Sequence, residues 1–169
     1  MSSFLFSKPD NAHILIVDDE PDVHAVTRLG LKGLRHEGSR LKFLSAESGA
    51  EGIEILRARP DIAVVLLDVV MESDHAGLEA CRLIRQELNN HFVRILLRTG
   101  QPGMAPERKT IDEYDIDDYL PKAELTTTRL YTAVRTALKA WNQIVELECH
   151  RSLLSAVSDC AISLRSFDD

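Results

Sequence analysis

The segment that most restricts the fold of this 169-residue chain is ILIVDDE, residues 14–20, where four strand-forming apolar residues run directly into three carboxylates. A continuous apolar run of this kind is typical of a strand that is buried on both faces. Three carboxylates held together repel one another by roughly 4 kcal/mol per pair at about 4 Å and an effective dielectric constant near 20. A folded chain that keeps them close therefore needs a compensating cation at the end of this strand.

Composition limits the classes of protein to which the chain can belong. With 44% hydrophobic and 28% charged residues, we expect one globular domain and an appendage. The 27 acidic residues outnumber the 20 basic ones, which argues against binding to nucleic acid. The start of the chain lacks the features of a signal peptide, and no later segment has the apolar length of a membrane span, so we expect a cytoplasmic protein. Cys81, Cys149 and Cys160 lack metal-ligand spacing and are interpreted as reduced thiols.

Apolar and helical segments alternate through the first two thirds of the chain. Short strands are predicted at 13–17, 41–46, 62–67, 94–97 and 117–120. Between them, Pro21 suits a first helical turn, the sequence SGAE from Ser48 suits a capping box, and GLEACRLIRQEL from Gly77 has helical spacing. Strict alternation of this kind predicts an α/β fold with a doubly wound, five-stranded parallel sheet. Ligands of such sheets bind beyond the carboxyl ends of the strands.

Five polar residues fall at those predicted strand ends. Each alone could cap a turn or be solvated. Together they comprise an acid pair, an isolated aspartate, a hydroxyl and an amine, which is the composition of a metal site for phosphoryl transfer. The five residues are Asp18, Asp19, Asp68, Thr99 and Lys122.

The order and spacing of these residues resemble the receiver domain of two-component response regulators, over roughly residues 12–140. The resemblance implies a flavodoxin-like receiver fold in which Asp68 accepts a phosphoryl group. It also implies a Mg²⁺ ion held by Asp18 and Asp19, with Asp19 in direct contact, by Asp68, and by the backbone carbonyl of Val70. The donor would be a histidine kinase or a phosphotransfer protein, and the domain itself would only phosphorylate and slowly dephosphorylate itself.

The same resemblance implies a conformational switch. Thr99 and Lys122 would contact the phosphoryl oxygens, and the movement of Thr99 would open space for Tyr119, three residues before Lys122. Two positions depart from the family pattern. Pro121 precedes the lysine instead of following it, and Glu72 stands where a proline is usual. The turn after the last strand is therefore not expected to follow the usual geometry.

Two other functions compete with this interpretation. A Mg²⁺-dependent phosphohydrolase of the haloacid-dehalogenase type also uses an aspartate nucleophile, but it usually carries a second aspartate two residues later, where this chain has Val70. An interaction module that works without phosphorylation would not need all five polar residues. Measured turnover of a generic phosphate ester separates the hydrolase from the switch.

The C-terminal part is predicted to be one long helix over residues 126–164, because no glycine or proline follows Pro121. Its first turns can pack as the last helix of a receiver at 13–140, after an N-terminal extension at 1–12. The segment 141–169 would be a helical linker or dimerisation extension. Its apolar stripe needs a partner chain, giving a homodimer, or an output domain that is missing from this sequence. The stripe comprises Ile144, Leu147, Leu154, Val157, Ala161 and Leu164.

Several stretches, including VLLDVVMESDHAGL and ILLRTGQPG, also resemble receivers at the head of larger bacterial regulators. Those regulators carry a cyclic-di-GMP phosphodiesterase or cyclase as their output. We therefore expect the chain to be the receiver part of such a regulator.

Overall fold

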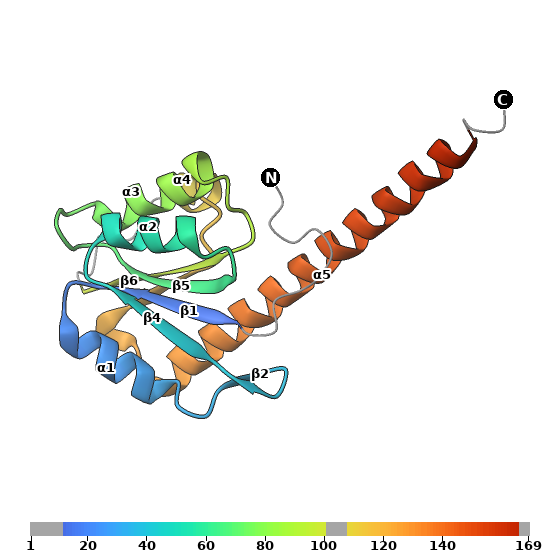
Figure 1. The fold of residues 1–169 in the computed structure, drawn as a ribbon. Helices are drawn as coiled ribbons and strands as arrows, with labels where there is room; N and C mark the ends of the chain where they lie inside the picture. The colour runs from blue at the N-terminus through green and yellow to red at the C-terminus, as the bar shows by residue number, and fades with distance from the viewer. Residues whose placement is uncertain (1–11, 101–107, 166–169) are drawn as a thin grey trace.

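The centre of the structure, a computed structural model that describes residues 12–100 and 108–165, is a five-stranded parallel sheet (Figure 1). The strands lie in the order β4-β1-β5-β6-β7, and every neighbouring pair is parallel. The predicted fold class is therefore confirmed. The strands are β1 (His13–Val17), β4 (Lys42–Ala46), β5 (Ile62–Asp68), β6 (Arg94–Thr99) and β7 (Asp118–Pro121).

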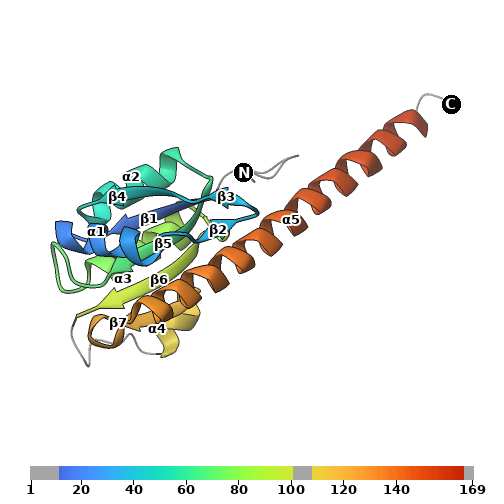
Figure 2. The same ribbon diagram turned by 90° about the horizontal axis from the view of Figure 1, so that it is seen from below.

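Helices cover both faces of the sheet, as the continuously apolar strands require. Side chains along β1 alternate, with Ile14 and Ile16 in one core cluster and Leu15 and Val17 in the other. The first cluster lies under α1 and α5, and the second lies under α2 and α3 (Figures 1 and 2). The helices are α1 (Pro21–Gly30), α2 (Gly49–Ala58), α3 (Ala76–Arg82), α4 (Arg108–Glu113) and α5 (Thr127–Arg165), and a short 3-10 helix covers Lys122–Glu124.

A small antiparallel hairpin, β2 (Arg35–His36) and β3 (Ser39–Arg40), was not predicted from the sequence. Its two-residue turn places Glu37 at φ 49° and Gly38 at φ 81°. Positive φ at both central residues is the geometry that matches the twist of a tight hairpin. Glutamate is uncommon at such a position, so residues 35–40 carry only a weak signal for a tight turn. The main strands were predicted to within two residues of their ends, with the last strand shifted from 117–120 to Asp118–Pro121.

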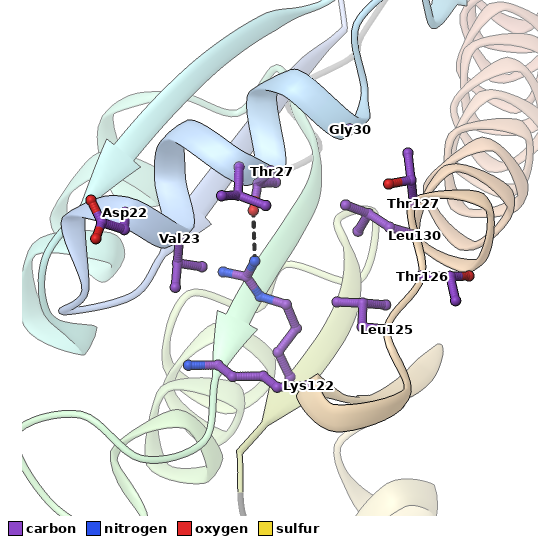
Figure 3. Close-up of a pocket in the computed structure, with 11 residues that line it drawn as sticks. Asp22, Val23, Thr27, Gly30, Lys122, Leu125, Thr126, Thr127 and Leu130 are labelled. Atoms are coloured by element: carbon purple, nitrogen blue, oxygen red, sulfur yellow. Dashed lines mark hydrogen bonds between the residues drawn. The ribbon is translucent and has the colours of Figure 1, made fainter.

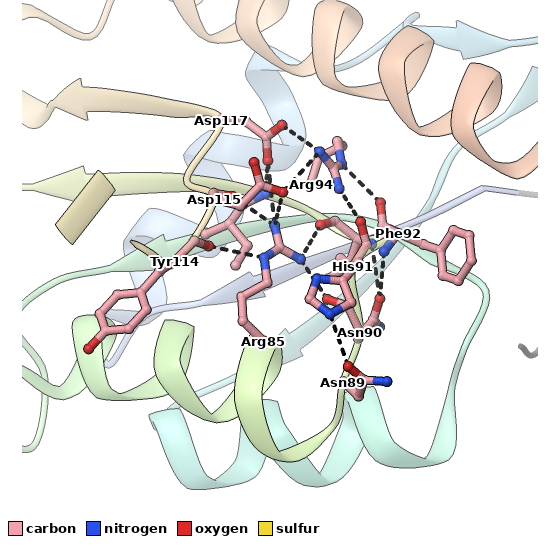
Figure 4. A network of polar contacts seen from close by, with 11 residues as sticks. Arg85, Asn89, Asn90, His91, Phe92, Arg94, Tyr114, Asp115 and Asp117 are labelled. Carbon is pink, nitrogen blue, oxygen red and sulfur yellow. Dashed lines mark hydrogen bonds and ion pairs between the residues drawn. The ribbon is translucent and has the colours of Figure 1, made fainter. Parts of the chain in front are cut away.

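The predicted third helix ends in a wider π-helical turn, Leu83–Glu87, where the Arg85 side chain turns into the molecule (Figure 4). The guanidinium of Arg85 donates to the carbonyl oxygens of Asn90 at 2.7 Å, Val93 at 2.8 Å and Asp115 at 2.8 Å. Arg94 lies beside it and donates to Asp117 at 3.0 Å. Because Arg85 satisfies carbonyls both in the segment before β6 and in the loop before β7, it holds these two segments together.

Helix α5 is continuous from Thr127 to Arg165, one residue later at each end than predicted. Figure 2 shows it crossing under the sheet and then extending well beyond it. Its predicted packing residues are all buried: Leu130, Val134, Ala137, Leu138 and Trp141.

Packing of α5 on the domain does not stop at residue 140. Val145 and Cys149 are also buried in the core, and Ile144 of the predicted stripe is half-buried. Ala12, which is predicted from the sequence to belong to an N-terminal extension, is buried as well. The rest of that extension lies outside the described residues.

Part of the predicted apolar stripe does face solvent. Leu147, Leu154 and Val157 are 70%, 72% and 67% exposed. The side chains of Ala161 and Leu164 lie outside those that the structure describes. Within the described part of the chain, no helix combines the length and the apolar character of a membrane span.

Candidate functional site

The carboxyl ends of the strands bring four of the predicted polar residues to one edge of the sheet. Asp18 follows β1, Asp68 ends β5, Thr99 ends β6 and Lys122 follows β7. The Lys122 amine donates to Oδ2 of Asp68 at 2.9 Å and lies 3.4 Å from Oδ2 of Asp18. Residues more than 100 positions apart therefore meet, as expected for the ends of parallel strands.

Asp68 lies at the centre of this group and is 3% exposed. Its Oδ1 accepts the N–H of Val69 at 2.9 Å, and its Oδ2 accepts the Lys122 amine. Burial raises the pKa of Asp68, although the hydrogen bond and charge of Lys122 oppose that shift. For Lys122, burial lowers the pKa, but its interactions with Asp68, Asp18 and Glu20 outweigh burial and leave the pKa raised. Lys122 therefore remains the cationic partner of Asp68.

Three carboxylates form a group that could hold a metal ion. Asp18, Glu20 and Asp68 each offer an oxygen atom, and these atoms lie within 4.8 Å of one another. Clustered carboxylate oxygens suit Mg²⁺, which prefers oxygen ligands and keeps several waters. Glu20 was not among the residues predicted for the site, although it is the third acid of the opening segment.

The other predicted residues occupy different surroundings. Asp19 is exposed and is not in the three-carboxylate group, so its direct contact with a metal stays a prediction, as does that of the Val70 carbonyl. Thr99 is 2% exposed at the end of β6. Tyr119 is half-buried on β7 and packs against the core cluster beneath α2 and α3.

Arg98, which sequence reasoning missed, is a second cation of the site. It is 2% exposed, and its Nη2 donates to Oδ2 of Asp18 at 3.1 Å. Its Nη1 donates to the hydroxyl of Thr27 on α1 at 2.8 Å. The available signal was the arginine that follows the apolar residues ILL in the strand RILLRT, directly before Thr99.

The two positions that depart from the family pattern, Glu72 and Pro121, have different surroundings in the structure. Glu72, which replaces a proline, accepts the N–H of Gly49 at 3.0 Å, at the start of α2. A carboxylate at a helix N-terminus is favourable because the backbone N–H groups there carry partial positive charge. Pro121 is the last residue of β7, and no peptide bond in the described parts of the chain is cis.

A cavity of about 260 Å³ adjoins the site between α1 and the start of α5 (Figure 3). Asp22, Val23 and Thr27 lie on its α1 side, and Thr127 and Leu130 lie on its α5 side. Arg98 and Lys122 also line it. The cavity therefore reaches the same two cations that contact the acidic group.

Comparisons with known proteins agree with this geometry. Residues 14–135 match the family model described as "Response regulator receiver domain". The chain is 43% identical over 153 residues to the 3'3'-cGAMP-specific phosphodiesterase 2 of Vibrio cholerae serotype O1, covering 90% of this chain and 29% of that protein. It is 30% identical over 128 residues to the transcriptional regulatory protein GlrR of Escherichia coli K12, covering 76% of this chain and 26% of that protein.

The fold is also found among solved structures. A response regulator receiver domain protein from Clostridium thermocellum superposes with a TM-score of 0.65 at 24% identity, covering 79% of this chain and 98% of the other. The chain spans less than a third of the length of the two curated relatives.

Proposed function

This chain belongs to the response regulator receiver domain family of two-component systems, and from that premise we propose that it is switched by phosphorylation of Asp68. The observation that carries the proposal is the contact of 2.9 Å between the amine of Lys122 and the buried carboxylate of Asp68. A carboxylate so placed is a nucleophile whose negative charge is already partly neutralised.

In the proposed reaction, a carboxylate oxygen of Asp68 attacks the phosphorus of a phosphohistidine. The bond from phosphorus to the histidine nitrogen breaks as the new bond to oxygen forms. Lys122 would offset the charge of the incoming phosphoryl oxygens, and the hydroxyl of Thr99 would bind one of them. A Mg²⁺ ion bound by the acidic group would supply further positive charge there. The position of Val70, two residues after Asp68, offers no acid or base for fast hydrolysis of the product.

Incubation with acetyl phosphate tests this proposal directly. We expect Mg²⁺ and acetyl phosphate to add the mass of one phosphoryl group to the intact chain, measured by mass spectrometry. Removal of Mg²⁺ with a chelator should prevent the addition of the phosphoryl group. Rapid, repeated turnover of a generic phosphate ester would instead identify a phosphohydrolase.

Binding of Mg²⁺ should also stabilise the fold, because the proposed ion site exists only when the fold brings Asp18, Glu20 and Asp68 together. At 100 times its dissociation constant, the ion should add about 2.7 kcal/mol to the free energy of unfolding. Melting temperatures with and without MgCl₂, at matched ionic strength, measure this effect. Comparison of Asp19→Asn with Glu20→Gln then shows which acid completes the site, because the variant that lacks the ligand loses more of the shift. An unchanged melting temperature in a protein that still becomes phosphorylated would contradict the prediction.

We further infer that the exposed face of α5 pairs with a second copy of the chain. Leu147 and Leu154 are seven residues apart and Val157 follows three residues later, which is the spacing of a coiled-coil seam. Leaving such side chains in water forgoes roughly 1.5 to 3 kcal/mol each. Arg151 pairs with Glu148 on the same helix, so we expect a loose pairing of helices.

Light scattering of the full chain tests the homodimer. Leu154→Glu should lower the mass to that of a monomer, because the glutamate would lie in the seam. Leu29→Glu is the matched control, since Leu29 is 70% exposed on α1 and should leave the mass unchanged. A monomeric wild-type protein at tens of micromolar would show that α5 does not pair in this way.

The similarity to a cGAMP phosphodiesterase supports a proposal for the output. We propose that this receiver regulates a cyclic-dinucleotide phosphodiesterase region linked to it in a longer protein. The activity of the longer protein should then change when Asp68 is phosphorylated.

A further inference from the structure

Arg98 is the most deeply buried cation of the site, and the proposed reaction assigns it no role. Its backbone lies beside that of Asp68, because the two residues are partners in the register of β5 and β6. The N–H of Val69 donates to the carbonyl oxygen of Arg98 at 2.9 Å. Arg98 therefore lies on the same strand as Thr99, and its backbone is hydrogen-bonded to the residue that follows Asp68.

The guanidinium group of Arg98 forms an ion pair with the carboxylate of Asp18. Nη2 lies 3.1 Å from Oδ2 of Asp18, and the bond from Nη1 to Thr27 at 2.8 Å holds the group in that orientation. Asp18 is 0% exposed, and its Oδ1 accepts the N–H of Glu20 at 3.1 Å. Because both charges are withdrawn from water, dissolved salt screens their attraction little. Asp18 thus has a permanent counter-ion within the protein.

The buried charges of the site balance without a metal ion. Among the residues that the structure describes, Asp18 and Asp68 are the buried acids of the site, and Arg98 and Lys122 are the cations that pair with them. An arginine remains protonated in proteins, so this positive charge does not leave when conditions change. The third acid, Glu20, has a side chain that is 65% exposed, and water can solvate it.

We propose that Arg98 is a positioning residue that sets the affinity of the acidic site for divalent cations. Its fixed charge neutralises Asp18 and weakens Mg²⁺ binding before phosphorylation. A cation at the group of Asp18, Glu20 and Asp68 shares Asp18 with the guanidinium, and like charges at such separations repel. A phosphoryl group on Asp68 adds negative charge that offsets this repulsion, so phosphorylation and metal binding favour each other. The inference rests on the proposed function, since it concerns the metal of that reaction.

Calorimetric titration of MgCl₂ into the full chain tests the role of Arg98. Arg98→Gln removes the charge but keeps an amide that can donate a hydrogen bond. We expect its dissociation constant for Mg²⁺ to be about tenfold lower than that of the wild type. Arg98→Lys keeps the charge, and its dissociation constant should stay within roughly threefold of the wild-type value.

Arg94→Gln is the matched control. Arg94 is on the same strand at the opposite end, is 5% exposed, and bonds Asp117 instead of the acidic group. Its loss should lower the stability of the fold without changing the dissociation constant for Mg²⁺. A change in that constant for Arg98→Gln alone therefore reports the local charge.

The outcomes separate this inference from the function on which it rests. A wild-type-like or weaker affinity in Arg98→Gln, with normal binding by the wild type, overturns the role of Arg98 only. Absence of Mg²⁺ binding in both proteins overturns the metal site as well.

If Arg98→Gln is unfolded in chelator, its folding on addition of MgCl₂ supports the inference, because the metal then replaces the guanidinium. Failure to fold at concentrations that saturate the wild type overturns it.

Discussion

Replacement of Asp68 by asparagine should abolish labelling by acetyl phosphate, because the amide lacks the anionic oxygen that attacks phosphorus. The fold should persist, since asparagine has nearly the same shape and removes a negative charge that repels Asp18. Mass spectrometry of the intact chain measures the labelling, and circular dichroism measures the fold. Complete loss of label in a folded variant is the largest functional effect that we expect from a single substitution.

Asp61→Asn provides the control for this experiment. Asp61 precedes the other end of β5 and bonds Arg59 at 2.9 Å, far from the acidic group along the same strand. Its substitution should leave labelling at the wild-type level. Label retained on Asp68→Asn would show that another residue accepts the phosphoryl group.

Replacement of Gly77 by alanine should destabilise the fold more than any other small substitution near the site. A Cβ atom at Gly77 would lie 2.1 Å from the carbonyl oxygen of Asp68 and 2.7 Å from the Cα atom of Val69. Both contacts are to backbone, so a rotation of a side chain cannot relieve them. Overpacking of this kind costs about 3 kcal/mol at the upper end of its usual range. Urea unfolding measures the loss, and slower labelling of Asp68 should accompany it.

Gly30→Ala is the matched comparison, because Gly30 is also helical. A Cβ atom there would lie 3.5 Å from the nearest atom of Leu130, which is an ordinary contact. Alanine is favoured over glycine in helices by about 1 kcal/mol. Gly30→Ala should therefore be neutral or stabilising, and an equal loss in both variants would contradict the argument from close contact.

The sheet and the position of Asp68 could be predicted because each depends on local sequence. Apolar runs mark the buried strands, and Asp68 ends one of these runs. Lys122 directly follows the short strand DYLP. Parallel strands then bring these residues to one edge whatever the details of packing. The long helix could likewise be predicted from a segment without glycine or proline.

The contacts that were missed depend on distant partners or on the path of a turn. Arg98 bonds Asp18, which is 80 residues away, and an arginine in a strand would usually be expected at the surface. The choice between Asp19 and Glu20 depends on how the chain turns from β1 into α1, which neighbouring acids in a sequence cannot show. The burial of Val145 and Cys149 depends on the shape of the domain surface that α5 crosses.

The unbroken course of α5 has a consequence for how a signal can be read. Its 39 residues span about 58 Å, and each residue advances the helix by about 100° around its axis. If α5 rotates about its axis where it packs on the sheet, the exposed leucines therefore rotate by the same angle. Their distance from the sheet changes little. Adding one residue near Ser152 would turn the far end to a different side, whereas adding seven would nearly restore it. The rotational position of the far end of α5, as well as its distance from the sheet, would therefore decide which surface a bound partner contacts.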